Sequence, residues 1–322
     1  MHQESLFPLR VLPTTRRVAD VVREGGLAAL PSAERKADAA TYQEVRCRSA
    51  LNAVKGMPFQ WTLNPYRGCT HACHYCFARR YHVQFELDGD DQFSSVILVK
   101  VYLIEVLARE LARPAWGREL VALGTATDPY QPIEGQYKLT RGALVQLAAA
   151  KTPVGIVTKG PMVVRDLDVL QDATRAAKCT VYVSVPTVDE DAWRRLEPGT
   201  AHPRQRLRAV RELTRGGIRA GVLMAPMVPG ITTSRRSLDA TLSAVAEHGA
   251  AFVGANVLHL EGGTRDHFFA FLAREYPHLI EGYERLYAGG AKRVPRAYSE
   301  AVHDVLAEAR RTTGLPDRED RS

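Results

Sequence analysis

The chain has 322 residues, of which 45% are hydrophobic and 25% are charged, and its formal net charge is +7. This apolar content is ample for a packed core, and the absence of any apolar run near the roughly 20 residues that span a bilayer excludes a membrane-spanning protein. Residues 1–17 contain no uninterrupted apolar stretch of the kind found in export signals, so we expect a cytoplasmic protein. The positive charge permits an anionic partner such as nucleic acid without requiring one.

Residues 1–50 differ in character from the rest of the chain. They are rich in Arg and Ala and show one helical pattern, around Arg17 to Leu30, before a polar linker. We expect this segment to be an N-terminal extension that lies over the main domain or is partly disordered. The main domain then occupies residues 51–275.

Short apolar or β-branched runs alternate with helical patterns through the main domain. The runs that resemble strands are 60–63, 96–100, 119–123, 154–158, 180–185, 220–224 and 252–258. Leucines at helical spacing mark helices within 103–111, 144–148, 167–174, 207–213 and 238–245. This alternation predicts βα units around a parallel sheet, and six or seven units are too few for a closed barrel of eight. Residues 276–322 place tyrosines in a helical pattern and predict a small helical tail that frays from Pro316 onward.

Three of the five cysteines stand in one short loop. Cys69, Cys73 and Cys76 have the spacing C-x-x-x-C-x-x-C, whereas Cys47 and Cys179 have no cysteine neighbours. Three thiolates at this spacing can hold three irons of a 4Fe-4S cluster, which normally takes four cysteines. The fourth iron would then be open to a small-molecule ligand.

Zinc is the alternative occupant of this loop, because His71 and His74 lie within it and could complete a Cys3His site. Structural zinc sites usually pair two ligand knuckles, and this chain has one, so we favour iron. A disulfide is disfavoured by the odd number of cysteines in a chain without a visible export signal.

The loop resembles the cluster motif of the radical S-adenosylmethionine (radical SAM) superfamily, in which an aromatic residue, here Tyr75, precedes the last cysteine. Further segments resemble the branch of that superfamily that contains spore photoproduct lyase and uncharacterised, often actinobacterial, relatives. These segments are Gly124 to Glu134, Val157 to Gly160 with Arg165 and Asp166, and Glu197 to Thr200 with Arg206. The resemblance covers roughly residues 51–272.

The resemblance implies an α/β fold, a partial (β/α)6 barrel of the TIM type, and two cofactors, a 4Fe-4S cluster and S-adenosylmethionine. The cofactor would chelate the open iron and be cleaved by one electron into methionine and a 5′-deoxyadenosyl radical, which abstracts hydrogen from a substrate. The electron would come from a reductase, a flavodoxin or a ferredoxin. The substrate stays open between nucleic acid and protein.

Several polar residues follow predicted strands, at the edge where parallel βα folds bind ligands. Lys159 ends a buried strand, where a charge requires an anion nearby, and a carboxylate is the obvious partner. The resemblance places Lys159 and Ser184 against the carboxylate and ribose of S-adenosylmethionine. It also places Tyr75 and Phe77 near the adenine, although both would equally suit ordinary packing.

The ammonium group of the cofactor would meet polar atoms of the segment that includes Thr127 and Asp128. Asp128 has the right charge, but it equally suits a turn before a proline. Glu197 and Arg206 are expected to form an ion pair that braces their loop. Asn256 and His259 follow the last strand and could line the substrate entrance.

One departure limits the functional transfer. Spore photoproduct lyases return a hydrogen atom through a cysteine in the segment that corresponds to residues 124–128, and no cysteine occurs here between Cys76 and Cys179. We therefore expect a radical SAM enzyme with another substrate. The alternatives are a zinc-stabilised nucleic-acid-binding module without catalysis and an iron-sulfur protein that does not cleave the cofactor.

Overall fold

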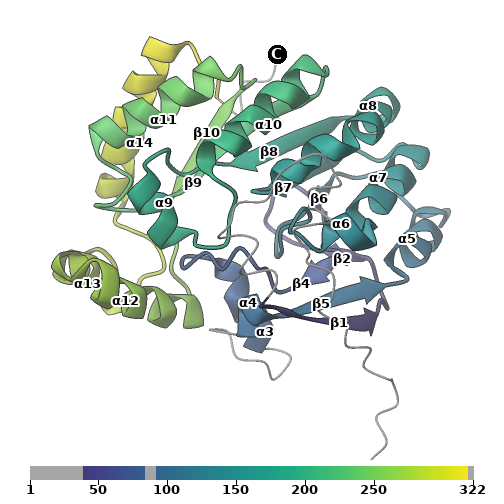
Figure 1. The fold of residues 1–322 in the computed structure, drawn as a ribbon, viewed down its shortest axis with the longest axis horizontal. Coiled ribbons are helices and arrows are strands. Elements are labelled where there is room, and N and C mark those ends of the chain that lie inside the picture. Colours follow the sequence, from purple (N-terminus) through teal and green to yellow (C-terminus); the bar gives the residue numbers. More distant parts are fainter. Residues whose placement is uncertain (1–38, 84–91, 318–322) are drawn as a thin grey trace, which may run out of the picture.

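A computed structural model describes residues 39–83 and 92–317 (Figure 1). The helix predicted around Arg17 to Leu30 lies outside these residues. A seven-stranded sheet forms the centre of the molecule, in the order β10-β9-β8-β7-β6-β3-β2, and its strands are parallel except that β2 runs antiparallel to β3. Its strands are β2 (Leu51–Ala53), β3 (Trp61–Leu63), β6 (Val121–Leu123), β7 (Val154–Thr158), β8 (Cys179–Ser184), β9 (Arg219–Met227) and β10 (Val253–Val257).

The central strands are buried, and helices cover the outer face of the curved sheet (Figure 1). The larger helices are α5 (Leu103–Leu111), α7 (Leu139–Ala149), α8 (Leu167–Ala176), α10 (Pro203–Arg215), α11 (Arg235–Glu247) and α14 (Arg296–Thr313). Leucines predicted from helical spacing, such as Leu107 and Leu207, are fully buried in the main core. The predicted α/β fold, an open partial barrel of parallel strands, is confirmed.

A second, three-stranded sheet stands apart from the barrel, in the order β1-β5-β4. It contains β1 (Thr41–Arg46), β4 (Tyr66–Arg67) and β5 (Val96–Val101). Two expectations are corrected here, since residues 96–100 are a strand outside the βα series and residues 41–46 form a strand in place of a polar linker. Ile97 and Val99 of β5 are buried, whereas Val96, Leu98 and Lys100 are partly exposed, which is the alternation of a sheet with one covered face.

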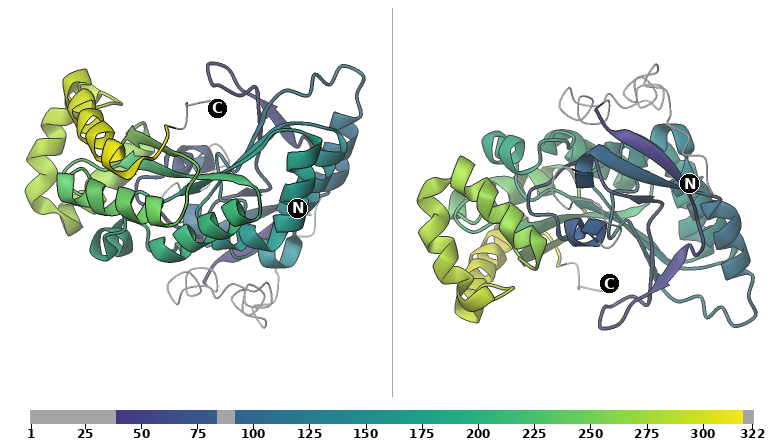
Figure 2. Two further views of the ribbon diagram at one scale, coloured as in Figure 1. Left: turned by 90° about the horizontal axis from the view of Figure 1, so that it is seen from above. Right: turned by 90° about the horizontal axis from the view of Figure 1, so that it is seen from below.

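The C-terminal helices lie at the opposite end of the molecule from the small sheet (Figure 2). Helix α14 packs on α11, while α12 (Gly263–Glu275) and α13 (Ile280–Leu286) pack on one another. The predicted helical tail is confirmed. The fraying that we expected from Pro316 onward is wrong for Pro316 and Asp317. The carbonyl of Pro316 accepts a hydrogen bond from the N–H of Val253, and Asp317 bridges to the same residue.

Shorter helices connect these elements. They are α3 (Arg80–Val83), α4 (Gln92–Ser95), α6 (Glu134–Tyr137) and α9 (Glu190–Leu196), with 3-10 turns at Phe77–Arg79, Pro161–Asp166, Pro277–Leu279 and Ala288–Gly290. Within residues 39–83 and 92–317, no helix has the length and apolar character that crossing a membrane requires.

Candidate active site

A cavity of about 410 Å³ opens at the C-terminal ends of the parallel strands, and we call it the cysteine cavity. The three clustered cysteines all line it, and the wall also includes residues of β7, β8, β9 and β10 and of the loops after β6, β7 and β10. The sequence-predicted site residues that line it are Cys69, Cys73, Cys76, Tyr75, Phe77, Thr127, Asp128, Lys159, Ser184, Asn256 and His259. The fold therefore brings together residues that are spread over most of the described chain.

The cysteine loop is held from behind by a buried arginine. The Arg79 guanidinium donates hydrogen bonds to the carbonyls of Ala72, at 3.4 Å, and of Cys73, at 3.2 and 3.3 Å. It also lies 5.1 Å from the ring centre of Phe93. Satisfying these carbonyls fixes a loop that has little regular structure of its own, and Ala72 adopts a left-handed backbone with φ of 52°.

A second loop, Glu197 to Thr200, docks directly on the cysteine loop. The N–H of Gly199 donates to the carbonyl of His71 at 3.1 Å, and the N–H of His74 donates to the carbonyl of Leu196 at 3.0 Å. A Cβ atom at Gly199 would lie 2.1 Å from the carbonyl oxygen of Thr70. Only glycine permits this close approach of two backbones.

The donor set of the loop fits an iron-sulfur cluster. Burial raises the pKa of Cys69 and of Cys76, and it raises the pKa of Cys73 to about 12, so the thiols are neutral until a metal centre replaces their protons. Among the described residues, no group of three or more His, Cys, Asp or Glu side chains is arranged to hold a single metal ion. Soft thiolates that line one cavity suit an iron-sulfur cluster, and zinc is the alternative occupant.

The other two cysteines lie elsewhere. Cys179 is the first residue of β8, and Ser184 at the other end of that strand lines the cysteine cavity. Five residues of strand separate them by roughly 16 Å. Cys47 follows β1, and its N–H bonds to the carbonyl of Val101 in the small sheet. Among the described residues, the cavity therefore has three cysteines and no fourth.

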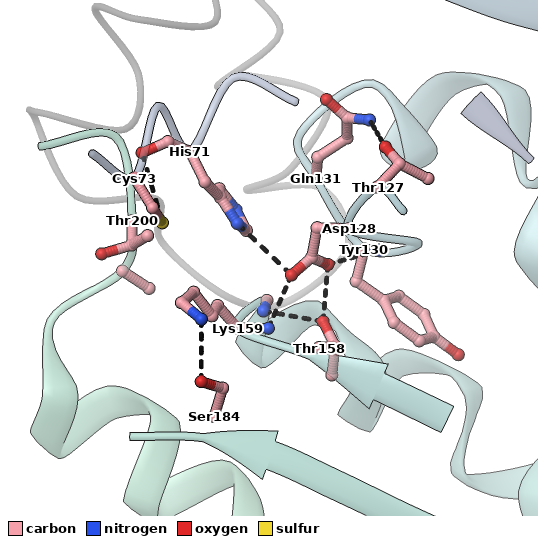
Figure 3. Close-up of polar contacts among 12 residues, drawn as sticks. His71, Cys73, Thr127, Asp128, Tyr130, Gln131, Thr158, Lys159, Ser184 and Thr200 are labelled. Atoms are coloured by element: carbon pink, nitrogen blue, oxygen red, sulfur yellow. Dashed lines mark hydrogen bonds and ion pairs between the residues drawn. The ribbon is translucent and has the colours of Figure 1, made fainter. Parts of the chain in front are cut away.

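Lys159 points from the end of β7 across the cavity wall (Figure 3). Its Nζ donates to Ser184 Oγ at 2.7 Å and lies 3.7 Å from Glu197 Oε1. Burial alone would lower the pKa of Lys159 and favour the neutral amine, but the acidic groups around it, Glu197 first among them, together raise that pKa, so this side chain is a cation. The anion that the structure places beside Lys159 is a carboxylate of the protein, Glu197, and the contact of Lys159 with the cofactor carboxylate stays a prediction.

Glu197 is the centre of a buried polar network. It accepts a hydrogen bond from the Tyr75 hydroxyl and pairs with the fully buried Arg206, as expected from the sequence. Although burial would raise the pKa of Glu197, Arg206 and Lys159 hold it below its usual value. Arg206 also donates to the carbonyls of Ala201 and Ser184, both at 2.8 Å. This network fixes the faces that Tyr75 and Lys159 present to the cavity.

The carboxylate of Asp128 is committed to contacts within the protein (Figure 3). One oxygen accepts from Thr158 Oγ1 at 2.6 Å and from the N–H of Tyr130 at 2.9 Å. The other accepts from the N–H of Lys159 at 2.6 Å and lies 3.3 Å from His71 Nδ1. Burial would raise the pKa of Asp128, but these partners, His71 first among them, keep it below its usual value. The geometry supports the turn role that the sequence offered for Asp128.

Thr127 is also held by its neighbours, since its hydroxyl donates to the carbonyl of Gly68 at 2.6 Å and accepts from Gln131 Nε2 at 3.0 Å. Gln131 and His71 are the residues that sequence analysis missed as supports of this segment. Gln131 lies within the segment 124–134 that resembles the lyase branch, so its position could have drawn attention to it. His71 was considered only as a zinc ligand.

Phe77 and Arg80 form the outer wall of the cavity. Phe77 is 45% exposed, and Arg80 pairs with Glu261 at 2.7 Å, which closes the wall against the loop after β10. His259 lies on the same side, and burial, followed by the charge of Arg293, lowers its pKa.

The fold and this cavity define a class of protein, a partial parallel barrel that gathers thiols and polar groups at one rim. A family model described as the radical SAM superfamily matches residues 63–243, more than half of the chain. The chain therefore belongs to the radical SAM superfamily and is an enzyme. Members of this superfamily use S-adenosylmethionine and an iron-sulfur cluster and generally need a reductant.

Relatives with similar sequences carry no described activity. An uncharacterised protein of Mycobacterium bovis and one of Mycobacterium tuberculosis are each 41% identical to this chain over 273 residues, which are 84% of this chain and 80% of each relative. An uncharacterised protein of Acidianus two-tailed virus is 26% identical over 219 residues, 66% of this chain and 71% of that protein.

Solved structures of spore photoproduct lyase share the fold. A double mutant with bound AdoMet and dinucleoside spore photoproduct matches with a TM-score of 0.66 at 16% identity, over 88% of this chain and 81% of that one. A single mutant with the dinucleoside spore photoproduct matches with a TM-score of 0.65 at 15% identity, over 94% and 92% of the two chains.

Proposed function

We propose that Cys69, Cys73 and Cys76 bind a 4Fe-4S cluster and that the enzyme cleaves S-adenosylmethionine reductively to act on a substrate by hydrogen abstraction. The cluster, when bound and reduced, would supply one electron that splits the sulfonium into methionine and a 5′-deoxyadenosyl radical, which takes a hydrogen atom from the substrate. The observation that carries this proposal is the convergence of three thiols, and no fourth among the described residues, on one cavity at the C-terminal rim of the parallel strands.

The polar residues of the cavity would bind and orient the S-adenosylmethionine. Lys159 is held as a cation with Glu197 beside it, so it suits the carboxylate of the methionine moiety. Ser184 Oγ lies 2.7 Å from the ammonium group of Lys159. Tyr75 is fixed by Glu197, and Phe77 is partly exposed on the cavity wall, so both suit contact with the adenine. Thr127 and Asp128 would shape the loop that faces the ammonium group of S-adenosylmethionine.

We propose that a reductase, a flavodoxin or a ferredoxin supplies the electron and that the enzyme works beside that donor in the cytoplasm. The zinc-binding alternative is separated from the proposal by the metal that the protein binds. An iron-sulfur protein without catalysis would bind the same cluster, so only the formation of 5′-deoxyadenosine distinguishes it from the proposed enzyme.

The test is anaerobic reconstitution with iron and sulfide, followed by dithionite reduction and quantification of 5′-deoxyadenosine and methionine. We expect iron and sulfide to be bound and 5′-deoxyadenosine to form. Cys73→Ala should lose both, whereas Cys179→Ala, a buried cysteine at the other end of its strand, should retain both. Colourless protein with stoichiometric zinc would refute the proposal, and a bound cluster that forms no 5′-deoxyadenosine would reduce it to the non-catalytic alternative.

A further inference from the structure

A second cavity, of about 540 Å³, adjoins the cysteine cavity, and we call it the cationic cavity. The two cavities share part of their walls, namely Phe77, Ala78, Arg80, Thr125 and Ala126. Most of the second wall comes from the β2–β3 hairpin and the small sheet, and Asn64, Gly68 and Tyr81 of α3 complete it. A ligand in the cationic cavity would therefore lie one side chain away from the cysteine cavity.

The charged side chains that line this second cavity are all positive. They are Lys55, Arg67, Arg80 and Lys100, and no carboxylate is among the described lining residues. Arg80 already pairs with Glu261 at 2.7 Å. For the Lys100 ammonium group, by contrast, no hydrogen bond or ion pair occurs within the part of the chain that the structure describes.

Lys100 and Arg67 lie on the same face of the small sheet. Arg67 of β4 pairs directly with Leu98 of β5, and Lys100 stands two residues further along β5, so the side chains at these positions project to one side. Burial, reinforced by the charge of Arg67, lowers the pKa of Lys100 to about 8. A partly buried lysine beside another cation is costly, and an anion between them would remove that cost.

Apolar and aromatic side chains complete the cationic cavity. Of the four large hydrophobic side chains that are exposed in the described residues, two line this cavity, Met57 at 54% and Phe77 at 45% exposure. Phe59 and Tyr81 also line it. Exposed apolar surface beside cations suits a ligand that has both a planar ring and a phosphate, because bases stack on aromatic rings while phosphates pair with lysine and arginine.

We infer that the cationic cavity is the substrate site and that it binds a nucleotide unit, free or within a nucleic-acid strand, with the phosphate at Lys100 and Arg67. The base or sugar then passes the shared wall at Phe77 and Thr125 toward the cysteine cavity. This inference rests on the proposed function, because it uses the cysteine cavity as the place where the radical forms. It adds the chemical class of the substrate, which the family leaves open.

The test measures binding to the reconstituted holoprotein under anaerobic conditions without reductant. The probe is a fluorescently labelled single-stranded oligonucleotide of mixed sequence, as DNA and as RNA, and the competitors are nucleoside monophosphates, inorganic phosphate and a phosphoserine peptide. The variants are Lys100→Gln, Lys100→Arg and a control, Lys178→Gln, which removes an exposed cation beside the first residue of β8. A thermal melt of each variant confirms that it is folded.

We expect Lys100→Gln to weaken binding of the oligonucleotide about tenfold, as loss of one charge-assisted contact does, and to reduce the slope of log affinity against log salt by about one. Lys100→Arg should keep most of the affinity, and Lys178→Gln should match the wild type. Competition by monophosphates would identify a free nucleotide as the ligand, and binding of the oligonucleotide that monophosphates do not displace would identify a strand. Inorganic phosphate that competes as well as the monophosphates would overturn the assignment of a nucleotide.

Unchanged affinity in Lys100→Gln overturns the inference, as does a phosphoserine peptide that competes better than the nucleotides, or a wild type that binds none of the probes. Failure of the proposed function is a separate result. It would appear as wild-type holoprotein that forms no 5′-deoxyadenosine after reduction, whatever the binding experiment shows.

Discussion

At the scale of single residues, Glu197 holds the candidate site together. It lies 3.7 Å from the Lys159 ammonium group and also contacts Arg206 and the Tyr75 hydroxyl, all in a buried setting. Removing one member of a buried charged network leaves the other charges uncompensated, which typically costs about 3–5 kcal/mol. Replacement of this one carboxylate should therefore lower the stability of the protein and weaken cofactor binding.

We predict that Glu197→Gln lowers the free energy of unfolding by about 3 kcal/mol at pH 7, measured by urea denaturation of cluster-free protein. The folded-state pKa of Glu197 lies below its usual value, so its stabilisation is present at neutral pH and is lost as the pH falls through that folded-state pKa. The difference between wild type and variant should therefore shrink below about pH 4.

The matched control for this prediction is Glu300→Gln, which removes an exposed carboxylate that pairs with Arg296 on the surface of α14. An exposed pair of this kind contributes between 0 and about 1 kcal/mol. If the two variants lose the same free energy at pH 7, or if the loss at Glu197 does not depend on pH, the network has no special role in stability.

Some of this network was predictable and some was not. The placement of Lys159 at the end of an apolar strand was enough to predict a nearby anion, because a buried cation needs one. The Glu197–Arg206 pair was also predicted, since both residues belong to one local segment. That Glu197 meets Lys159 and Tyr75 was not predicted, because each contact joins segments that only the barrel brings together.

At the scale of elements, the docking of the Glu197-to-Thr200 loop on the cysteine loop decides where the thiols lie. We predict that Gly199→Ala loses most of the cluster on reconstitution and lowers the thermal midpoint of the protein, because its Cβ would meet the Thr70 carbonyl at 2.1 Å and must displace one backbone. Iron content and melting curves measure both effects.

A matched control is Gly282→Ala, which adds the same methyl group in α13, where nothing lies within 4 Å of the new atom. Helix propensity favours alanine there, so stability should be equal or slightly higher, by up to about 1 kcal/mol. Full iron content in Gly199→Ala would contradict the idea that the two loops position one another.

The elements that sequence analysis placed correctly are those with a strong period. Helices α5, α8 and α10 follow from leucines at helical spacing, and β7 and β8 follow from short buried runs. Strand β5 was assigned to the wrong sheet because Val96 to Val101 is apolar at nearly every position, which hides the one-sided burial seen in the structure. Strand β1 was missed because its polar residues carry no comparable signal, and only Tyr42 of its six residues is buried.

At the scale of the whole molecule, the chain has the fold of spore photoproduct lyase without a feature that the sequence resemblance associates with that activity. The segment 124–128, where that resemblance places a hydrogen-returning cysteine, lines the cysteine cavity and consists of Gly, Thr, Ala, Thr and Asp. Cys179 cannot take its place, because it begins a strand whose opposite end reaches the cavity. The two proteins therefore share the fold, while the segment that the resemblance associates with hydrogen return has no thiol in this chain.

We predict that reduced holoprotein supplied with S-adenosylmethionine does not convert a dinucleotide spore photoproduct into its repaired dinucleotide. The decisive control is 5′-deoxyadenosine in the same reaction, because its formation shows that the cofactor chemistry runs while repair does not. Placing a thiol on the cavity wall with Ala126→Cys provides a further comparison, since Ala126 belongs to both cavities and is partly exposed. Repair by the unmodified chain would mean that another residue returns the hydrogen atom. It would contradict the prediction that this chain lacks photoproduct lyase activity.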